Sequence, residues 1–574
     1  MKRFLICLGA ALALLSSCKE SIKAEKGYLL IPSQNHGPEA LLSINVKGEN
    51  ILGEKQVIEL ATDRIDYWIP IDISSVRGSR LELLVETPDG TEAGPVEFRQ
   101  SDSREFSRDE RFRPVYHFSP DFGWTNDPNG MVYYDGEYHL AYQANPYGTR
   151  HYNMHWGNAV SEDLVHWTDL PVIVRPDSLG AVFSGSAVLD AEGSAGFGDN
   201  ALVAMYTSAG RLQRQSIAYS LDRGRNYTKY EGNPVITDLD SPDFRDPKMM
   251  KYGDSWVVSV AAGDVIAFYG SKDLKDWTKL SEFGRGIGSH AAVWECPDLI
   301  RFEYEGQTKW VLLVSINPGG PNGGSVTQYF IGDFDGKEFR ADPLPYPLWI
   351  DEGTDNYAGV TFANTGDRKI FLGWMSNWFY SQETPFENFR NAMTIPRDLS
   401  LRHNGKHLFL ASSPSPEVLA ARCDEKSLAL PDVIARPESV SPVIEDNNGA
   451  YVIEFTAVPD KGKKMELQLR NTKGEKMVFR FDFRAGKLSL DRSNSGIVDF
   501  EPRFSNDNIV TDIVPRKEYF VQLFVDRHST ELFINDGDVS FTNTMFPTEV
   551  YDILDFIPLD GKMTIKDAKV SRIK

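Results

Sequence analysis

The clearest candidate for chemistry is a carboxylate, Asp127, within residues 124–130 (Trp-Thr-Asn-Asp-Pro-Asn-Gly). Pro128 favours an extended backbone at Asp127, and a Pro followed two places later by Gly is typical of a tight turn. An amide, Asn126, and an indole, Trp124, accompany the carboxylate. The same pattern is typical of a surface turn with a capping Asp. This segment alone therefore leaves both a catalytic and a structural carboxylate open.

A second acidic candidate is Glu295, in residues 294–298 (Trp-Glu-Cys-Pro-Asp). An indole precedes it and a thiol follows it, and both side chain types are usually buried. Partial removal from water would raise the pKa of the carboxyl group, as a general acid requires. The alternative is an exposed Glu on a strand.

A third acidic candidate is Asp246, which lies between Arg245 and Pro247. An adjacent guanidinium keeps a carboxylate ionised and oriented, so the two side chains together suit the hydroxyl groups of a ligand. A purely structural pair at a strand end is the competing interpretation.

Further hydrogen-bonding and aromatic groups occur near predicted strand ends. A sugar site needs polar groups for the ring hydroxyls and a flat apolar surface for the ring face. The residues that supply such groups here are Gln143, Trp156, Phe183 and Ser184. Each is compatible with simple packing when taken alone, so their order along the chain carries the prediction.

A weak internal repeat predicts how these residues are positioned. Residues 161–167 (Ser-Glu-Asp-Leu-Val-His-Trp) and 271–277 (Ser-Lys-Asp-Leu-Lys-Asp-Trp) match closely, and looser copies begin at Ser220 and Gly332. Copies that recur every 50 to 60 residues or so, with strands between them, are typical of propeller blades of about four strands. We therefore predict a propeller over 110–411.

The flanking segments predict two further β-domains, so the whole chain is expected to be all-β. Short runs that alternate apolar and polar residues occur at 42–46, 67–73 and 81–85, which indicates a small β-sandwich over 26–100. Alternation returns after Asp446 and predicts a second β-sandwich over 427–574, joined to the propeller by a Pro/Ser-rich linker at 412–426.

Composition excludes several classes of partner. The chain has 61 Lys and Arg against 82 Asp and Glu, a formal net charge of −21. Such an acidic chain argues against nucleic acid as a partner, because phosphate binding needs clustered cations. No Cys/His cluster has zinc spacing, so we predict neither a metal nor a cofactor. The oligomeric state does not follow from the sequence.

The N-terminus predicts a lipoprotein signal peptide over 1–18. Lys2 and Arg3 precede an apolar run at 4–15 that is too short to span a bilayer. Residues 15–18 (Leu-Ser-Ser-Cys) resemble a bacterial lipobox, in which Cys18 would carry the lipid. The prediction is an anchored protein of the cell envelope, at the outer membrane, with the membrane face undecided. An ordinary secretory signal with a chance Cys is the alternative.

The ordered motifs of the chain resemble glycoside hydrolase family 32, the family of invertases, inulinases and levanases. The resemblance runs from Arg113 to the C-terminus and rests on many short motifs. These are 113–118, 124–130, 143–146, 183–186, 245–247, 295–297, 351–358, 373–375, 394–397 and 526–537.

The resemblance implies a five-bladed β-propeller, a C-terminal β-sandwich and hydrolysis of β-fructofuranosidic bonds with retention of configuration. By motif, Asp127 matches the nucleophile, Glu295 the acid/base, and Asp246 the carboxylate that binds fructosyl hydroxyls. The implied substrates are fructans, fructo-oligosaccharides and sucrose. Residues expected around the fructosyl pocket are Trp124, Asn126, Gln143, Trp156, Phe183, Ser184, Arg245 and Trp374.

Several functional alternatives stay open at this point. Thr125 and Ala144 depart from the residues usual in the family and leave the preference between levan and inulin undecided. If the aromatic residues enclose one terminal sugar, cleavage is exo-acting, but an endo-acting enzyme remains the alternative. A fructan-binding propeller without catalysis and a transfructosylase are the other candidates. The N-terminal sandwich lies outside the family pattern and receives no predicted function.

Overall fold

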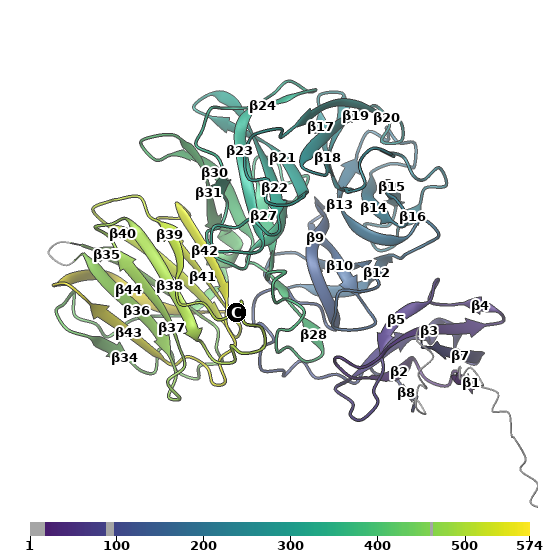
Figure 1. Cartoon of the computed structure of the whole chain (residues 1–574), viewed down its shortest axis with the longest axis horizontal. Coiled ribbons are helices and arrows are strands. Elements are labelled where there is room, and N and C mark those ends of the chain that lie inside the picture. The colour runs from purple at the N-terminus through teal and green to yellow at the C-terminus, as the bar shows by residue number, and fades with distance from the viewer. Residues whose placement is uncertain (1–17, 88–96, 460–462) are drawn as a thin grey trace, which may run out of the picture. The chain divides into compact units, whose positions relative to one another are not determined.

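The computed structural model describes residues 18–87, 97–459 and 463–574 (Figure 1). The chain divides into a first unit that ends at Ser107 and a second unit from Arg108 to Lys574. Within the described ranges the only helical elements are a 3-10 turn at Ser74–Val76 and α1 (Pro416–Ala420). None of these described helices has the length and apolar character needed to cross a membrane. The all-β prediction is confirmed.

The first unit consists of two antiparallel sheets around a core of Leu and Ile side chains, among them Leu30, Ile44 and Leu83. It begins earlier than the predicted residue 26, because the backbone from Cys18 to Lys23 pairs with Arg80–Glu86. Residues 1–17 of the predicted signal peptide lie outside the described residues. The larger sheet contains β1 (Cys18–Lys23), β7 (Arg80–Glu86), β3 (Glu39–Val46), β4 (Glu49–Asn50) and β5 (Gln56–Glu59), and the smaller contains β6 (Tyr67–Asp72), β2 (Tyr28–Ser33) and β8 (Arg99–Ser101).

Five sheets of four main strands each form the propeller of the second unit (Figure 1). Blade 1 contains β9 (Gly123–Tyr134), β10 (Glu137–Asn145), β11 (His155–Ser161) and β12 (Thr168–Val174). Blade 2 contains β13 (Ala181–Asp190), β14 (Ala201–Ala209), β15 (Gln213–Ser220) and β16 (Thr228–Lys229). Blade 3 contains β17 (Phe244–Tyr252), β18 (Ser255–Ala262), β19 (Val265–Ser271) and β20 (Trp277–Phe283).

Blade 4 contains β21 (Trp294–Tyr304), β22 (Gln307–Ile316), β23 (Val326–Phe334) and β24 (Phe339–Ala341), with β25 (Leu348–Trp349) also paired to β23. Blade 5 contains β26 (Tyr357–Thr361), β27 (Ile370–Met375), β30 (Arg397–His403) and β31 (Leu408–Pro414), with β29 (Ala392–Met393) on β27. The short strand β28 (Phe389–Arg390) pairs in parallel with β9.

The first strands of the five blades line the centre of the propeller. They contact one another in the closed order β9, β13, β17, β21, β26 and back to β9. Their residues are mostly buried, whereas the fourth strands β12 and β20 are mostly half-buried or exposed. Side chains of the first strands therefore meet around the central axis, which is where a propeller builds a site.

The repeated motif marks the turn between the third and fourth strands of a blade. In blades 1 and 3, Asp163 and Asp273 each accept hydrogen bonds from the backbone N–H groups two and three positions later in the chain, at 2.8–3.0 Å. Trp167 and Trp277 each donate to a backbone carbonyl three residues earlier. The looser copies at Ser220 and Gly332 begin in the third strands of blades 2 and 4.

The C-terminal sandwich consists of two sheets that share one large apolar core. It begins within the predicted linker, because Arg422–Ser427 already pairs with the last strand. The first sheet contains β32 (Arg422–Ser427), β33 (Val433–Ile434), β35 (Tyr451–Val458), β40 (Tyr519–Asp526), β41 (Ser529–Ile534), β42 (Val539–Thr544) and β44 (Met563–Ile573). The second contains β34 (Glu438–Val440), β36 (Lys464–Arg470), β37 (Lys476–Asp482), β38 (Lys487–Asn494), β39 (Ile509–Asp512) and β43 (Ile553–Pro558).

A buried ion-pair network joins the propeller to this sandwich. His117 lies 2.8 Å from both Asp526 and Glu531, and its side chain is 1% exposed. Arg397 of blade 5 forms an ion pair with Glu531 and another with Asp351 at 2.7 Å. Burial alone would lower the pKa of His117, but the hydrogen bonds to the two carboxylates outweigh burial and raise the pKa to about 9.

We expect the stability of the second unit to fall as His117 loses its proton. When the pKa of a histidine is higher in the folded than in the unfolded state, its full contribution to stability is present below the unfolded pKa. That contribution is lost as the pH rises from the unfolded pKa, about 6.5, to the folded pKa, about 9. The shift corresponds to about 3 kcal/mol of unfolding free energy. His117→Gln should be less stable at neutral pH and should flatten the dependence of Tm on pH over this range.

His166→Gln is the matched control, because His166 also pairs with a carboxylate, Asp163 at 2.7 Å, but its side chain is 63% exposed. Thermal unfolding of the three proteins between about pH 6 and pH 10 measures the effect. Equal slopes in wild type and His117→Gln would contradict the proposed charge on His117.

Candidate active site

All five inner strands are irregular at the same level of the propeller. In each, the pairing with the second strand of the blade skips register, so extra residues bulge toward the axis. Bulges re-aim side chains and are common beside active sites. The residues in or at the bulges are Asn126 and Asp127, Ser184, Asp246 and Pro247, Cys296 and Pro297, and Ala358 and Gly359.

Three of these bulges contain a non-glycine residue in the left-handed backbone region. The φ angles are 63° at Asp246, 46° at Cys296 and 53° at Ala358. Such conformations cost free energy and persist where the surroundings determine them. Of these three side chains, that of Asp246 lines the cavity, while those of Cys296 and Ala358 are buried.

Asp127 is held by hydrogen bonds to both of its carboxylate oxygens. Ser184 Oγ donates to Oδ2 at 2.5 Å, and Asn126 Nδ2 donates to Oδ1 at 2.9 Å. The Cys296 thiol lies 3.6 Å from Oδ2. Burial raises the pKa of Asp127, while the hydrogen bonds from Ser184 and Asn126 oppose that increase.

Glu295 is held by a cation and a phenol. Arg245 donates to Oε1 through Nε and Nη2, both at 3.1 Å, and the Tyr357 hydroxyl donates to Oε2. The side chain of Glu295 is 24% exposed. Glu295 is therefore partly removed from water, as its neighbours Trp294 and Cys296 suggested: it lines the cavity, while Trp294 packs in the core.

Asp246 is the most buried of the three carboxylates, with 6% of its side chain exposed. Its Oδ2 accepts a hydrogen bond from the backbone N–H of Cys296 at 3.0 Å. Burial raises the pKa of Asp246 to about 7 against the opposing effect of Arg245, and the charges of Glu295 and Asp127 add to the increase. The other two acids therefore lie close enough to influence the protonation of Asp246.

The three carboxylates open into one cavity of about 380 Å³. Gln143 donates to Ser184 Oγ at 3.3 Å, and its Oε1 accepts no hydrogen bond from a described residue. That oxygen is available to a hydroxyl group of a ligand. All three predicted catalytic acids and most of the predicted pocket residues line the cavity, namely Asn126, Asp127, Gln143, Phe183, Ser184, Arg245, Asp246 and Glu295.

Three predicted tryptophans lie behind the cavity wall instead of lining it. Trp124, Trp156 and Trp374 are completely buried. Trp156 donates from Nε1 to the backbone carbonyl of Phe183 at 3.0 Å, so it supports a lining residue. Trp124 and Trp374 pack against Trp378, with ring centroids 5.9 and 4.9 Å from it. Trp378 lines the cavity and so takes the place predicted for them.

The sequence prediction missed several lining residues. They are His151, Gln213, Asp243, Val293, Asn317 and Trp378. Asp243 forms an ion pair with Arg245 at 2.7 Å, and its position two residues before Arg245 was a signal that could have been used. Tyr357 lies within the motif at 351–358 but had no role assigned. His151 has no comparable signal, because its loop has no regular pattern.

Among the described residues, no group of three or more His, Cys, Asp or Glu side chains is arranged to hold a metal ion. The site offers hydrogen-bond acceptors, one guanidinium, and carboxylates that can exchange protons. Two carboxylic groups, one held by a hydroxyl and an amide and one beside a cation and a phenol, suit acid–base and nucleophilic chemistry.

Comparison with known proteins places this arrangement in a family. Residues 117–412 match the glycosyl hydrolases family 32 N-terminal domain, and residues 424–572 match glycosyl hydrolases family 32 C terminal. A levanase of Bacillus subtilis (strain 168) is 42% identical over 482 residues, which are 81% of this chain and 71% of the levanase. An extracellular exo-inulinase of Aspergillus awamori is 36% identical over 491 residues, 77% of this chain and 91% of that protein.

A solved structure agrees with these matches. The crystal structure of exo-inulinase from Aspergillus awamori superimposes with a TM-score of 0.75 at 32% sequence identity, over 82% of this chain and 99% of that chain. The predicted family and the predicted propeller with a C-terminal sandwich are both confirmed. The chain belongs to glycosyl hydrolases family 32 and is a glycosidase.

Proposed function

We propose that this glycosidase is a retaining β-fructofuranosidase that hydrolyses fructans and releases terminal fructose. The observation that carries the proposal is the convergence of Asp127, Asp246 and Glu295 in one cavity, each turned inward by a bulge of a different blade. The levanase and exo-inulinase relatives support a fructan as the substrate.

In the first step, the Asp127 carboxylate attacks the anomeric carbon of the terminal fructosyl unit. The bond from that carbon to the glycosidic oxygen breaks, and the oxygen takes a proton from the Glu295 carboxyl group. The hydrogen bonds from Ser184 and Asn126 fix the two oxygens of Asp127, so the attacking atom is already positioned.

In the second step, Glu295 is a carboxylate and removes a proton from water, whose oxygen attacks the anomeric carbon and releases Asp127. Arg245 and Tyr357 hold the two oxygens of Glu295, so one side chain can serve both steps without reorienting. Asp246 accepts hydrogen bonds from ring hydroxyls, which strengthen as positive charge develops on the ring.

Terminal cleavage is supported by the shape of the central channel. Below the carboxylates, Lys248, Asp298 and Thr361 fill the channel with buried side chains joined by hydrogen bonds and an ion pair. Trp378 and His151 close one side of the cavity, with ring centroids 5.1 Å apart. Such a pocket accepts the end of a chain more readily than its middle.

We expect hydrolysis to proceed with retention, and NMR of the first-formed fructose tests this. A β-linked fructan should first yield the β-anomer, because two displacements restore the original configuration. Asp127→Asn should reduce kcat by at least about four orders of magnitude on all substrates. Glu295→Gln should largely spare the first step for a fructoside whose leaving group needs no proton, while the second step becomes slow.

Asp264→Asn is the matched control for these variants, because its side chain is 68% exposed and lies outside the cavity lining. It should turn over like wild type. An α-anomer as the first product would mean inversion, and the roles given to Asp127 and Glu295 would then be wrong.

We also expect free fructose to be the main product from the earliest stage of digestion. Product analysis on a β2,6-linked and a β2,1-linked fructan measures it and reveals the preferred linkage. The reason is that Lys248, Asp298 and Thr361 close the channel below the carboxylates, so the cavity accepts the end of a fructan chain. Early accumulation of mixed oligosaccharides with little fructose would contradict exo-cleavage and favour an endo-acting enzyme.

We further propose that Cys18 is lipidated and anchors the protein in the cell envelope. The lipobox at 15–18 and the preceding charged and apolar segments support this proposal. Cys18→Ala, expressed with a cleavable signal in place of the native one, should shift the protein from the membrane to the soluble fraction. Mass spectrometry should find acyl chains on wild type. Unmodified wild-type protein in the soluble fraction would rule the anchor out.

A further inference from the structure

A second cavity, of about 420 Å³, lies further along the same inner strands. Its lining begins two to four residues beyond the catalytic ones, at Lys248 after Asp246 and at Asp298 after Glu295. At about 3.3 Å per residue this places it about 7–13 Å further along the propeller axis. Inner strands of blades 2 to 5 contribute to it, and nothing in the proposed reaction uses it.

The charge of this second cavity is opposite to that of the catalytic one. Four cations and two acids line it: Lys248, Lys251, Arg301 and Lys369, with Glu192 and Asp298. Four acids and one Arg line the catalytic cavity: Asp127, Asp243, Asp246 and Glu295, with Arg245. In a chain of net charge −21, a surplus of cations in one hollow is a local feature that attracts anions.

Lys369 is the cation that a ligand can use. Lys248 pairs with Asp298 at 3.6 Å, Lys251 with Glu192 at 2.9 Å and Arg301 with Glu303 at 2.6 Å. Lys369 Nζ donates to the carbonyl of Gly366 at 3.0 Å, and among the described residues no carboxylate lies within ion-pair distance of it, although the charges of Asp367 and Asp298 act on it from further away. Burial lowers the pKa of Lys369, so an anion beside it would relieve an unfavourable position.

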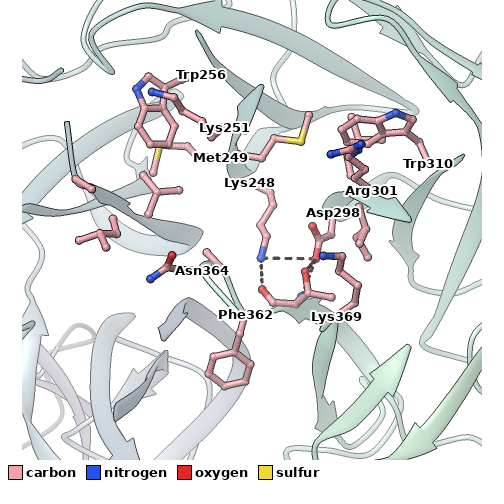
Figure 2. A pocket seen from close by; sticks show the side chains of 18 of the residues that line it. Lys248, Met249, Lys251, Trp256, Asp298, Arg301, Trp310, Phe362, Asn364 and Lys369 are labelled. Carbon is pink, nitrogen blue, oxygen red and sulfur yellow. Dashed lines mark hydrogen bonds and ion pairs between the residues drawn. The ribbon is translucent and has the colours of Figure 1, made fainter. Parts of the chain in front are cut away.

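Figure 2 shows that Lys248, Asp298 and Lys369 converge at one side of the cavity, while the ring of Phe362 projects away from them. Further apolar lining comes from Val188, Met250, Leu299 and Ala363. A polar group held at one side and an apolar surface around the rest is the usual arrangement of a small-molecule site.

The aromatic residues argue against a second sugar site. Trp256 is 4% exposed, and Lys251 Nζ lies 4.5 Å from the centroid of its ring. Trp310 is 5% exposed and packs against Tyr252 and Phe334. Neither indole offers a free face on which a sugar ring could stack.

We propose that this second cavity binds a small organic anion, whose acid group pairs with Lys369 and whose apolar body rests on the partly exposed side chains of Leu189, Met250 and Ala363. The proposal does not depend on the reaction at the other end of the channel. It requires only a monoanionic acid group joined to an apolar ring or short chain that fits the hollow.

The test uses the fluorescent anion 1-anilinonaphthalene-8-sulfonate with the full protein, at fixed ionic strength. Its neutral analogue N-phenyl-1-naphthylamine lacks the sulfonate and serves as the matched probe. Wild type should bind the anion saturably at one site and bind the neutral analogue at least about tenfold more weakly, as expected when a charge-assisted contact is lost. Inorganic phosphate, which has no apolar body, should displace the anion only weakly.

Lys369→Gln should raise the Kd of the anionic probe about tenfold, and Lys369→Arg should restore most of the affinity. Ala191→Glu adds a negative charge at an exposed residue of the cavity lining and should also weaken binding. Lys406→Gln, at an exposed lysine outside the cavity lining, is the control and should bind like wild type. Unchanged glycosidase activity in all four variants verifies that they are folded.

Three results would each overturn the proposal. One is equal affinity for the anionic and neutral probes, because Lys369 would then contribute nothing. Another is a Kd within twofold of wild type for both Lys369→Gln and Ala191→Glu, which would place the probe elsewhere on the protein. The third is displacement by inorganic phosphate as effective as that by an aromatic carboxylate, which would mean a site for inorganic anions only.

Discussion

The site depends on one backbone constraint, the coincidence of bulges on all five inner strands. A regular strand turns successive side chains to opposite faces, so it cannot present adjacent residues such as Arg245 and Asp246 to the same cavity. Each extra residue breaks that alternation at one level of the propeller. The Pro residues after Asp246 and Cys296 suit these positions, because a bulged residue gives up its ladder hydrogen bond in any case.

The strain at those bulges is offset by the packing of the rest of the molecule. Left-handed conformations at Asp246, Cys296 and Ala358 persist because their neighbours hold them, as when Thr207 Oγ1 accepts the Asp246 N–H at 3.0 Å. Blade 5, which carries Ala358, is in turn fixed to the sandwich through Arg397. The sandwich thus contributes to the geometry of the site although none of its residues lines the cavity.

Much of the fold and of the candidate site could be predicted from the sequence, and the wrong predictions have physical causes. The repeat was visible because an Asp that accepts backbone hydrogen bonds and a Trp that donates one recur at fixed spacing in the turns of blades 1 and 3. Trp156 was predicted to line the pocket because it occurs in a motif, but a motif does not tell whether a side chain lines the cavity or packs behind its wall. His151 and Trp378 reach the cavity from loops, whose paths depend on tertiary contacts and leave no periodic pattern.

The inner strands also explain why the two cavities along one channel differ in the sign of their charge. Lys248 follows Asp246 by two positions and Asp298 follows Glu295 by three, so a short stretch of strand carries the change from an acidic to a basic hollow. The buried pair Lys248–Asp298 lies at the boundary and neutralises itself there. An acidic cavity suits a neutral sugar, because carboxylates accept hydrogen bonds from its hydroxyl groups, whereas it repels anions. Anions are therefore disfavoured in the catalytic cavity and favoured in the second cavity, where cations exceed acids.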